Sequence, residues 1–371
     1  MSVFIIPLLV ISMVNEFFGT VAQVIRVLTN RPFIPNYGYA LLGDVSVDGQ
    51  AMHARVDTRI AALYFTWTAF YERFTHRGAC ATLFTGCYEC PGGCKVGQIS
   101  PITYVDCTRV DIFSHQGQLA FSQGTVDSIQ FGVVDGQYPT PEKLVPLNSI
   151  GLGLREIVGY RPLMVQLQGK ITGPTFAMYL KTSPSPGTPP KGELLLGGGD
   201  PTVYVAPLHY VPLLSQQEYL VTIDSLQVAG GKEMAGINSP ILIDTRAQAL
   251  TLPQSFVGGL IEDLSDQASK AAGTKVFIAW TPALGIWNFE CPFISYFPKL
   301  FVGLGHGGSV HLTVSGKHYT RNFGGVCSLA ITQSPGGSWV FPDFMIIDRY
   351  VEFQPSEGRV GFADLTFANP M

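Results

Sequence analysis

Two short stretches of the sequence carry carboxylates in the same local setting, and both could do acid–base chemistry. Asp57-Thr58 and Asp244-Thr245 each follow a run that is typical of a strand, and the second run, residues 241–243, is wholly aliphatic. A carboxylate at the end of a buried strand must be hydrogen-bonded, paired or protonated, because burying it bare costs several kcal/mol. Two such carboxylates placed together can share one proton, so that one acts as a base and the other as an acid.

The repetition of this Asp-Thr pattern, once in each half of the chain, predicts two similar lobes around a shared site. The 371 residues also suit two lobes of about 170 to 180 residues each. We expect a signal peptide at residues 1–22, an N-terminal lobe at residues 23–190 and a C-terminal lobe at residues 191–371. A low charged fraction of 13%, with 41 Gly and 26 Pro, indicates a turn-rich β protein. The best helix candidate spans residues 254–272, and Gly273 ends it.

The Asp-Thr turns belong to a series of motifs that resembles the pepsin-like aspartic peptidases. In that family each lobe supplies Asp-Thr-Gly, followed by Ser or Thr, to a catalytic pair of carboxylates. The other similar segments stand in the family's order, at residues 38–47, 63–65, 149–153, 176–180, 192–198, 250–253, 343–346 and 359–363. The resemblance implies an all-β, bilobal fold with two barrel-like lobes, a few short helices and a central cleft. It also implies that Asp57 and Asp244 stand at the catalytic positions.

Both turns differ from the family at the two positions after Asp-Thr, whose residues hydrogen-bond the catalytic carboxylates in the family. Arg59 and Arg246 replace the two Gly residues, and Ile60 and Ala247 replace the hydroxyl residues that follow. Because a guanidinium beside a carboxylate favours the ionised form, we expect the two Arg side chains to pair with the two Asp residues and remove their shared proton. The sequence therefore predicts a silent pair of carboxylates.

Other family features are partly kept. Thr58 and Thr245 are candidates for the hydrogen bonds that join the two turns across the lobes in the family. Residues 112–117, Ile-Phe-Ser-His-Gln-Gly, stand where the family places a Tyr-Gly-Thr-Gly hairpin, the flap, over its cleft, and we identify no equivalent Tyr. The flap is therefore expected to lack its usual side chain.

The N-terminal segment and the seven cysteines indicate an oxidising compartment. The first residues hold an apolar core too short to span a bilayer, and Thr20-Val21-Ala22 offers small residues for cleavage before Gln23. N-terminal sequencing of the secreted chain tests this expectation, and a start at Met1 would contradict it. Five cysteines crowd into residues 80–107, where we expect disulfides and one odd thiol rather than a zinc site. Cys291 and Cys327 are expected to form a disulfide, which the resemblance also implies.

The sequence predicts a secreted or lumenal, monomeric aspartic peptidase homologue that has lost activity and binds or inhibits a polypeptide. No cofactor or metal is expected, and a net charge of -4 without a long basic run argues against nucleic acid. No membrane partner is expected after signal cleavage. One alternative is an aspartic endopeptidase that still works through Asp57 and Asp244. Another is an inhibitor of glycoside hydrolases, similar to inactive plant relatives that use loops outside the cleft.

Overall fold

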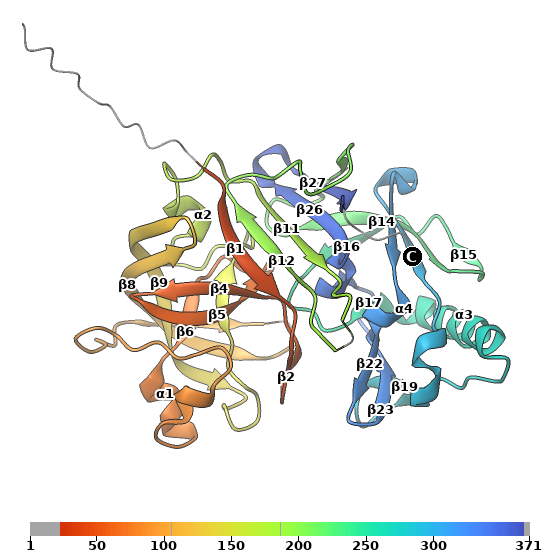
Figure 1. Cartoon of the computed structure of the whole chain (residues 1–371), viewed down its shortest axis with the longest axis horizontal. Coiled ribbons are helices and arrows are strands. Elements are labelled where there is room, and N and C mark those ends of the chain that lie inside the picture. The colour runs from red at the N-terminus through yellow and green to blue at the C-terminus, as the bar shows by residue number, and fades with distance from the viewer. Residues whose placement is uncertain (1–22, 105, 186, 367–371) are drawn as a thin grey trace, which may run out of the picture.

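Two β-rich lobes lie side by side and are joined by a shared sheet (Figure 1). The computed structural model describes residues 23–104, 106–185 and 187–366. The expected signal peptide at residues 1–22 lies outside the described residues. In Figure 1 the N-terminal half runs from red to yellow on one side, and the C-terminal half runs from green to blue on the other. The all-β, bilobal architecture predicted from the sequence is confirmed.

The shared sheet holds the first described strand and strands from the end of the chain, with β11 and β12 between them. Its neighbouring strands are, in order, β13 (His209–Pro212), β27 (Arg359–Asp364), β26 (Arg349–Gln354), β11 (Phe176–Lys181), β12 (Lys191–Leu196) and β1 (Ile25–Asn30). Leu194 of β12 faces Val27 of β1 and Met178 of β11, and all three side chains are buried. The expected lobe boundary after residue 190 falls in the connection between β11 and β12.

The sheet continues from β1 into the N-terminal lobe. Its next strands are β4 (Leu42–Val47), β5 (Gln50–Asp57), β10 (Asn148–Gly151), β6 (Tyr64–Thr66), β9 (Gly124–Tyr138), β8 (Arg109–Phe121) and β7 (Ile99–Thr103). A small hairpin of β2 (Phe33–Ile34) and β3 (Gly38–Tyr39) and the short helices α1 (Thr68–Phe74) and α2 (Leu163–Gln166) complete this lobe. Since β7 is the last strand of the sheet, one of its edges is free of strand partners among the described residues.

The C-terminal lobe is built on two further sheets. The larger holds β21 (Val310–Val314), β20 (Leu300–Leu304), β14 (Leu220–Val228), β16 (Ser239–Ile243), β25 (Trp339–Phe341), β17 (Leu250–Pro253) and β24 (Ile331–Ser334), with β15 (Glu233–Met234) beside β14. The smaller holds β18 (Ala279–Thr281), β19 (Ile286–Phe289), β23 (Val326–Leu329) and β22 (Thr320–Phe323), and α4 (Gly316–Tyr319) leads into it.

Helix α3 (Gln254–Ala272) covers the larger sheet and confirms the helix predicted from the sequence. Its buried residues are Val257, Leu260, Ile261, Leu264 and Ala268, which share one face at helical spacing. Gly273 ends the helix with a positive φ of 66°, a conformation that glycine adopts without steric cost. In the described part of the chain, no helix combines the length and the apolar character needed to cross a membrane.

Three disulfides are formed among the described residues. The expected bond between Cys291 and Cys327 lies in the C-terminal lobe and ties the end of β19 to β23. In the N-terminal lobe, Cys80 bonds Cys87 and Cys90 bonds Cys94. Cys107 is the remaining exposed thiol in the described ranges. These pairings resolve the connectivity that the sequence left open.

The Cys291–Cys327 bond closes a loop with a sequence separation of 36, so its removal should be costly. By the chain-entropy estimate, replacing both residues by Ala should lower the free energy of unfolding by about 3 to 4 kcal/mol, measured by urea denaturation. The matched control replaces Cys90 and Cys94, whose separation is only 4, and should cost about 2 kcal/mol. Equal losses in the two variants, or free thiols at Cys291 and Cys327 in non-reducing peptide maps, would contradict the prediction.

Candidate active site

Each candidate carboxylate lies where a buried strand of one lobe ends beside a parallel neighbour. Asp57 is the last residue of β5, which runs parallel to β10, and Asp244 follows β16, which runs parallel to β25. The backbone N–H of Asp244 donates to Phe341 on β25 at 3.0 Å. The backbone carbonyl of Asp57 accepts from Leu152, which follows β10, at 2.7 Å. The two halves of the sequence thus build the same frame twice.

The residue after each Asp joins the two frames across the lobes. The backbone N–H of Thr58 donates to Oγ1 of Thr245 at 3.1 Å, and the backbone N–H of Thr245 donates to Oγ1 of Thr58 at 3.1 Å. Each hydroxyl donates onward to a backbone carbonyl of the other lobe, Thr58 to Ile243 at 2.9 Å and Thr245 to Val56 at 2.7 Å. Both threonines are buried, and these are the cross-lobe hydrogen bonds expected of them. They fix how the two carboxylates face each other.

The side chains of Arg59 and Arg246 do not pair with the two carboxylates, so that expectation is wrong. Arg59 forms an ion pair with Glu218 at 2.7 Å, and Arg246 forms one with Asp106 at 2.9 Å. What reaches the carboxylates is backbone: the N–H of Arg59 donates to Oδ1 of Asp57 at 2.8 Å, and the N–H of Arg246 donates to Oδ1 of Asp244 at 2.8 Å. An Asp side chain that accepts a hydrogen bond from the backbone N–H two residues later makes a tight turn. In both turns the Arg side chain pairs with a different carboxylate.

The cation beside the pair is Arg55, which the sequence analysis missed. A terminal guanidinium nitrogen of Arg55 donates to Oδ2 of Asp57 at 3.2 Å, and the other donates to the hydroxyl of Tyr37 at 2.7 Å. Arg55 is 3% exposed and Asp57 is fully buried, so this is a buried ion pair. The signal was present in the sequence, because residues two apart on a strand lie on the same face of the sheet.

The hairpin over the site is also not where the sequence placed it. Residues 112–117 lie within β8 and pair with β9, so they form no turn. The hairpin that reaches the site joins β7 to β8, and Tyr104 begins its turn, with its backbone N–H donating to Thr108 at 2.8 Å. Tyr104 is buried, and its hydroxyl lies 2.7 Å from the hydroxyl of Tyr64. The expectation that the flap lacks a Tyr is therefore wrong, because Tyr104 lies at the turn of the hairpin that covers the site.

Arg246 holds this hairpin, which we call the β7–β8 hairpin, from the opposite lobe. Its guanidinium carbon lies 3.4 Å from the ring centroid of Tyr104, and it pairs with Asp106 and hydrogen-bonds Thr108. A cation over an aromatic face is attracted by the ring quadrupole. A cavity of about 30 Å³, lined in part by Arg55, Tyr104 and Arg246, remains here. That space is about the share of one water molecule in the liquid.

Asp244 keeps an electrostatic feature of a proton-sharing pair. Burial, and next the charge of Asp57, raises the pKa of Asp244 to about 6, although the backbone N–H and the charge of Arg246 oppose the shift. A raised pKa in the folded state means that folding favours the protonated form of this carboxyl. In the mildly acidic range one carboxyl of the pair is therefore protonated while Asp57 is held by Arg55.

Stability should fall as Asp244 loses its proton. Because its folded pKa of about 6 lies above the ordinary value of 3.8, the folded state binds more protons than the unfolded state between these values. The free energy of unfolding should drop by on the order of 3 kcal/mol from pH 4 to pH 7 relative to an Asp244→Asn variant, measured by urea denaturation. Exposed Asp266→Asn is the control and should parallel the wild type. An unchanged difference between wild type and Asp244→Asn across this range would refute the prediction.

Comparisons with known proteins agree with this geometry. A sequence model of the eukaryotic aspartyl protease family matches residues 95–365, which include Asp244 but begin after Asp57. Cathepsin D of Clupea harengus is 28% identical over 212 residues, 55% of this chain and 49% of the relative. Cathepsin E of Aquarana catesbeiana is 28% identical over 213 residues, 54% of this chain and 47% of the relative. The chain thus spans about half the length of the curated relatives it matches. Since the family model covers most of the sequence, the chain belongs to the eukaryotic aspartyl protease family.

Proposed function

We propose that this chain is a catalytically silent aspartic peptidase homologue that binds a polypeptide without cleaving it. The observation that carries the proposal is the buried ion pair between Arg55 and Asp57, at 3.2 Å. A working pair of carboxylates shares one proton, and the oxygen free of the backbone turns a water molecule into the nucleophile. Here Oδ1 of Asp57 accepts backbone N–H groups and Oδ2 accepts Arg55. Both oxygens therefore already accept hydrogen bonds, and a water molecule at Oδ2 would have to compete with the guanidinium of Arg55.

The space between the β7–β8 hairpin and Arg55 is also small. The long side chains of Arg55 and Arg246 and the ring of Tyr104 surround the cavity of about 30 Å³. Arg246 binds the β7–β8 hairpin through an ion pair, a hydrogen bond and a ring contact. A substrate backbone entering between the lobes would have to displace these contacts. Occlusion and the Arg55 ion pair support the same conclusion.

A polypeptide-sized groove remains open beside the silent pair. It has a volume of about 680 Å³ and is lined by Ile60, strand β7, Ser114 and residues 155–160. Ile60 is three residues from Asp57, and β7 offers a free sheet edge, to which an extended peptide can add as a further strand. Val158 is 94% exposed and Ile99 is 39% exposed, so apolar side chains line its rim. This groove is our proposed site for an extended polypeptide.

The compartment follows from the cysteine chemistry. Disulfides persist in oxidising environments such as the secretory lumen and the extracellular space, and are rare in the cytosol. The three disulfides of the described residues support a secreted or lumenal protein. Its polypeptide partner would be met in that compartment.

One observation favours a second function, that of an active aspartic endopeptidase. The pKa of Asp244 is raised to about 6 by burial and by the charge of Asp57, which is the behaviour of two carboxylates that share a site. The cross-lobe threonine hydrogen bonds are complete as well. If Arg55 swung away from Asp57, Oδ2 of Asp57 would lose its cationic partner, and Asp57 and Asp244 could share one proton.

The silent state should depend on Arg55 and Arg246 and not on the Arg of the first Asp-Thr-Arg turn. The unmodified protein should show no proteolysis of unfolded protein substrates from pH 3 to pH 6. Arg55→Leu with Arg246→Gly should bind a pepstatin-like transition-state mimic at least tenfold more tightly than the wild type, measured by calorimetry, because Oδ2 of Asp57 is released and the cavity is enlarged. The matched control is Arg59→Gly, which restores the family motif but removes only the pair with Glu218.

The two candidate functions predict opposite results in this experiment. Efficient cleavage by the unmodified chain, abolished by Asp57→Asn, would refute the silent state and establish the endopeptidase. Tighter binding of the mimic by Arg59→Gly than by the Arg55 and Arg246 variant would show that the motif residue, not the buried ion pair, controls the site.

Polypeptide binding at the groove is tested separately from catalysis. Reduced and carboxymethylated lactalbumin, an unfolded polypeptide, should bind the wild type without being cleaved, measured by fluorescence anisotropy. Val158→Asp should weaken this binding about tenfold, because it places a charge on the apolar rim of the groove. Val205→Asp alters another exposed valine, outside the groove lining, and should bind as the wild type does. Equal affinities for all three proteins would count against the groove.

A further inference from the structure

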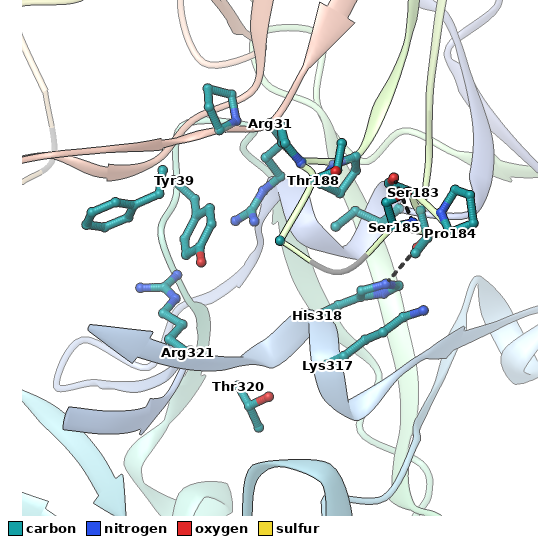
Figure 2. A pocket seen from close by; sticks show the side chains of 17 residues that line it. Arg31, Tyr39, Ser183, Pro184, Ser185, Thr188, Lys317, His318, Thr320 and Arg321 are labelled. Atoms are coloured by element: carbon teal, nitrogen blue, oxygen red, sulfur yellow. Dashed lines mark hydrogen bonds between the residues drawn. The ribbon is translucent and has the colours of Figure 1, made fainter. Parts of the chain in front are cut away.

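A second large cavity lies away from the carboxylates, on the other side of the β2–β3 hairpin. It has a volume of about 680 Å³ and lies between Arg31 and Phe33, residues 182–185 and 187–190, and the segment from Lys317 to Arg321. Figure 2 shows Arg31 and Arg321 reaching toward Tyr39 from different sides, with Lys317 and His318 at the other end of the cavity. A volume of this size is typical of small-molecule sites.

The cavity is lined by basic groups and by no carboxylate among the described residues. Arg31, Lys317, His318 and Arg321 all line it. The two arginines flank one aromatic ring, because the guanidinium carbon of Arg31 lies 4.7 Å and that of Arg321 lies 5.9 Å from the ring centroid of Tyr39. Cations placed this close repel each other unless an anion compensates them.

The nearby carboxylates are already engaged. Asp343 is buried and forms an ion pair with Arg31 at 2.8 Å. Asp348 accepts from the backbone N–H and the hydroxyl of Thr182, both at 2.7 Å. Neither carboxylate lines the cavity. The charge of Arg31 is therefore compensated, and that of Arg321 is not compensated by an ion pair of its own.

Arg321 contacts the ring of Tyr39 but forms no ion pair with a described carboxylate. None of the described carboxylates lies within ion-pair distance of its guanidinium, and one terminal nitrogen is buried without a hydrogen-bond partner in the described structure. Burial, and next the charge of Arg31, lowers the pKa of Arg321 to about 10, so it stays charged at neutral pH. Arg321 is half-buried, and partial removal of a charge from water without an ion-pair partner is destabilising. Such a group is stabilised if an anion binds beside it.

We propose that this cavity binds a phosphate or sulfate monoester of a small organic molecule, with the oxyanion between Arg31 and Arg321 and the organic group against Phe33 and Tyr39. Guanidinium groups donate in forks that match such oxyanions, and two that approach from different sides can meet three terminal oxygens. The organic part is required because the cavity is far larger than an inorganic ion. The rings of Phe33 and Tyr39, with centroids 5.5 Å apart, offer an apolar surface for it. This site does not depend on the proposed function of the carboxylate pair.

Direct binding of simple monoesters tests the proposal. Phenyl phosphate and phenyl sulfate are titrated into the full protein by calorimetry at pH 7.5, with benzoate and inorganic phosphate as comparisons. At least one monoester should bind at least tenfold more tightly than inorganic phosphate. Comparison of the phenyl phosphate and phenyl sulfate titrations shows which oxyanion is preferred. Arg321→Gln should weaken that binding at least tenfold, whereas Lys299→Gln, an exposed charge outside the cavity lining, should leave it unchanged.

A variant without the buried charge separates binding from folding. Arg321→Met should abolish monoester binding yet raise the Tm of the ligand-free protein by about 2 °C, because a half-buried cation without an ion pair is replaced by an apolar side chain. A purely structural Arg321 would instead lower the Tm when replaced. Failure of both monoesters to bind the wild type at 10 mM, equal binding by Arg321→Gln, equal affinity for benzoate, or a lowered Tm in Arg321→Met would each overturn the proposal.

Discussion

The hydrogen bonds that Thr58 and Thr245 exchange across the lobes are the constraint on which the carboxylate site depends. Each threonine uses its backbone N–H and its hydroxyl on the opposite lobe. Both are buried, so leaving any of these polar groups unpaired would cost about 1 to 3 kcal/mol. Because β5 and β16 end directly at this junction, the positions of Asp57 and Asp244 are fixed by it. These hydrogen bonds position the two carboxylates but do not determine whether the pair is active.

Whether the carboxylate pair can act in catalysis depends on which arginine contacts Asp57. Arg59 and Arg246 sit next to the threonines, yet only their backbone N–H groups approach the carboxylates. Arg55 lies two residues earlier on β5 and meets Asp57 directly. A buried ion pair adds little stability by comparison with apolar packing, but removal of one partner leaves an uncompensated charge and costs about 3 to 5 kcal/mol. Arg55 and Asp57 therefore depend on each other, which opposes any state in which Asp57 is free.

The short β2–β3 hairpin lies between the carboxylate pair and the basic cavity. Tyr37, at its turn, accepts a hydrogen bond from Arg55, and the backbone carbonyl of Tyr39 accepts one from Gln248 of the other lobe. The ring of Tyr39 faces Arg31 and Arg321 in the basic cavity. Gly38 is required here, since its φ is 110° and a Cβ would lie 2.7 Å from the side chain of Gln248. One hairpin thus contacts the groups that define both sites.

The fold could be predicted from the sequence, chiefly through the ordered motifs that resemble the pepsin-like peptidases. Helix α3 and the positions of the two candidate carboxylates follow from local patterns: apolar residues at helical spacing with Gly273 as a stop, and an Asp at the end of an apolar strand. The sequence places Arg55 and Asp57 on one face of a strand, but only the tertiary structure shows that Arg55, and not Arg59 or Arg246, contacts Asp57 and that Tyr104 covers the site. An arginine side chain is long enough to reach several acceptors, so its partner depends on where Glu218 and Asp106 lie after folding. The hairpin that carries Tyr104 was likewise set by the pairing of β7 with β8, because strand register joins residues that no local motif connects.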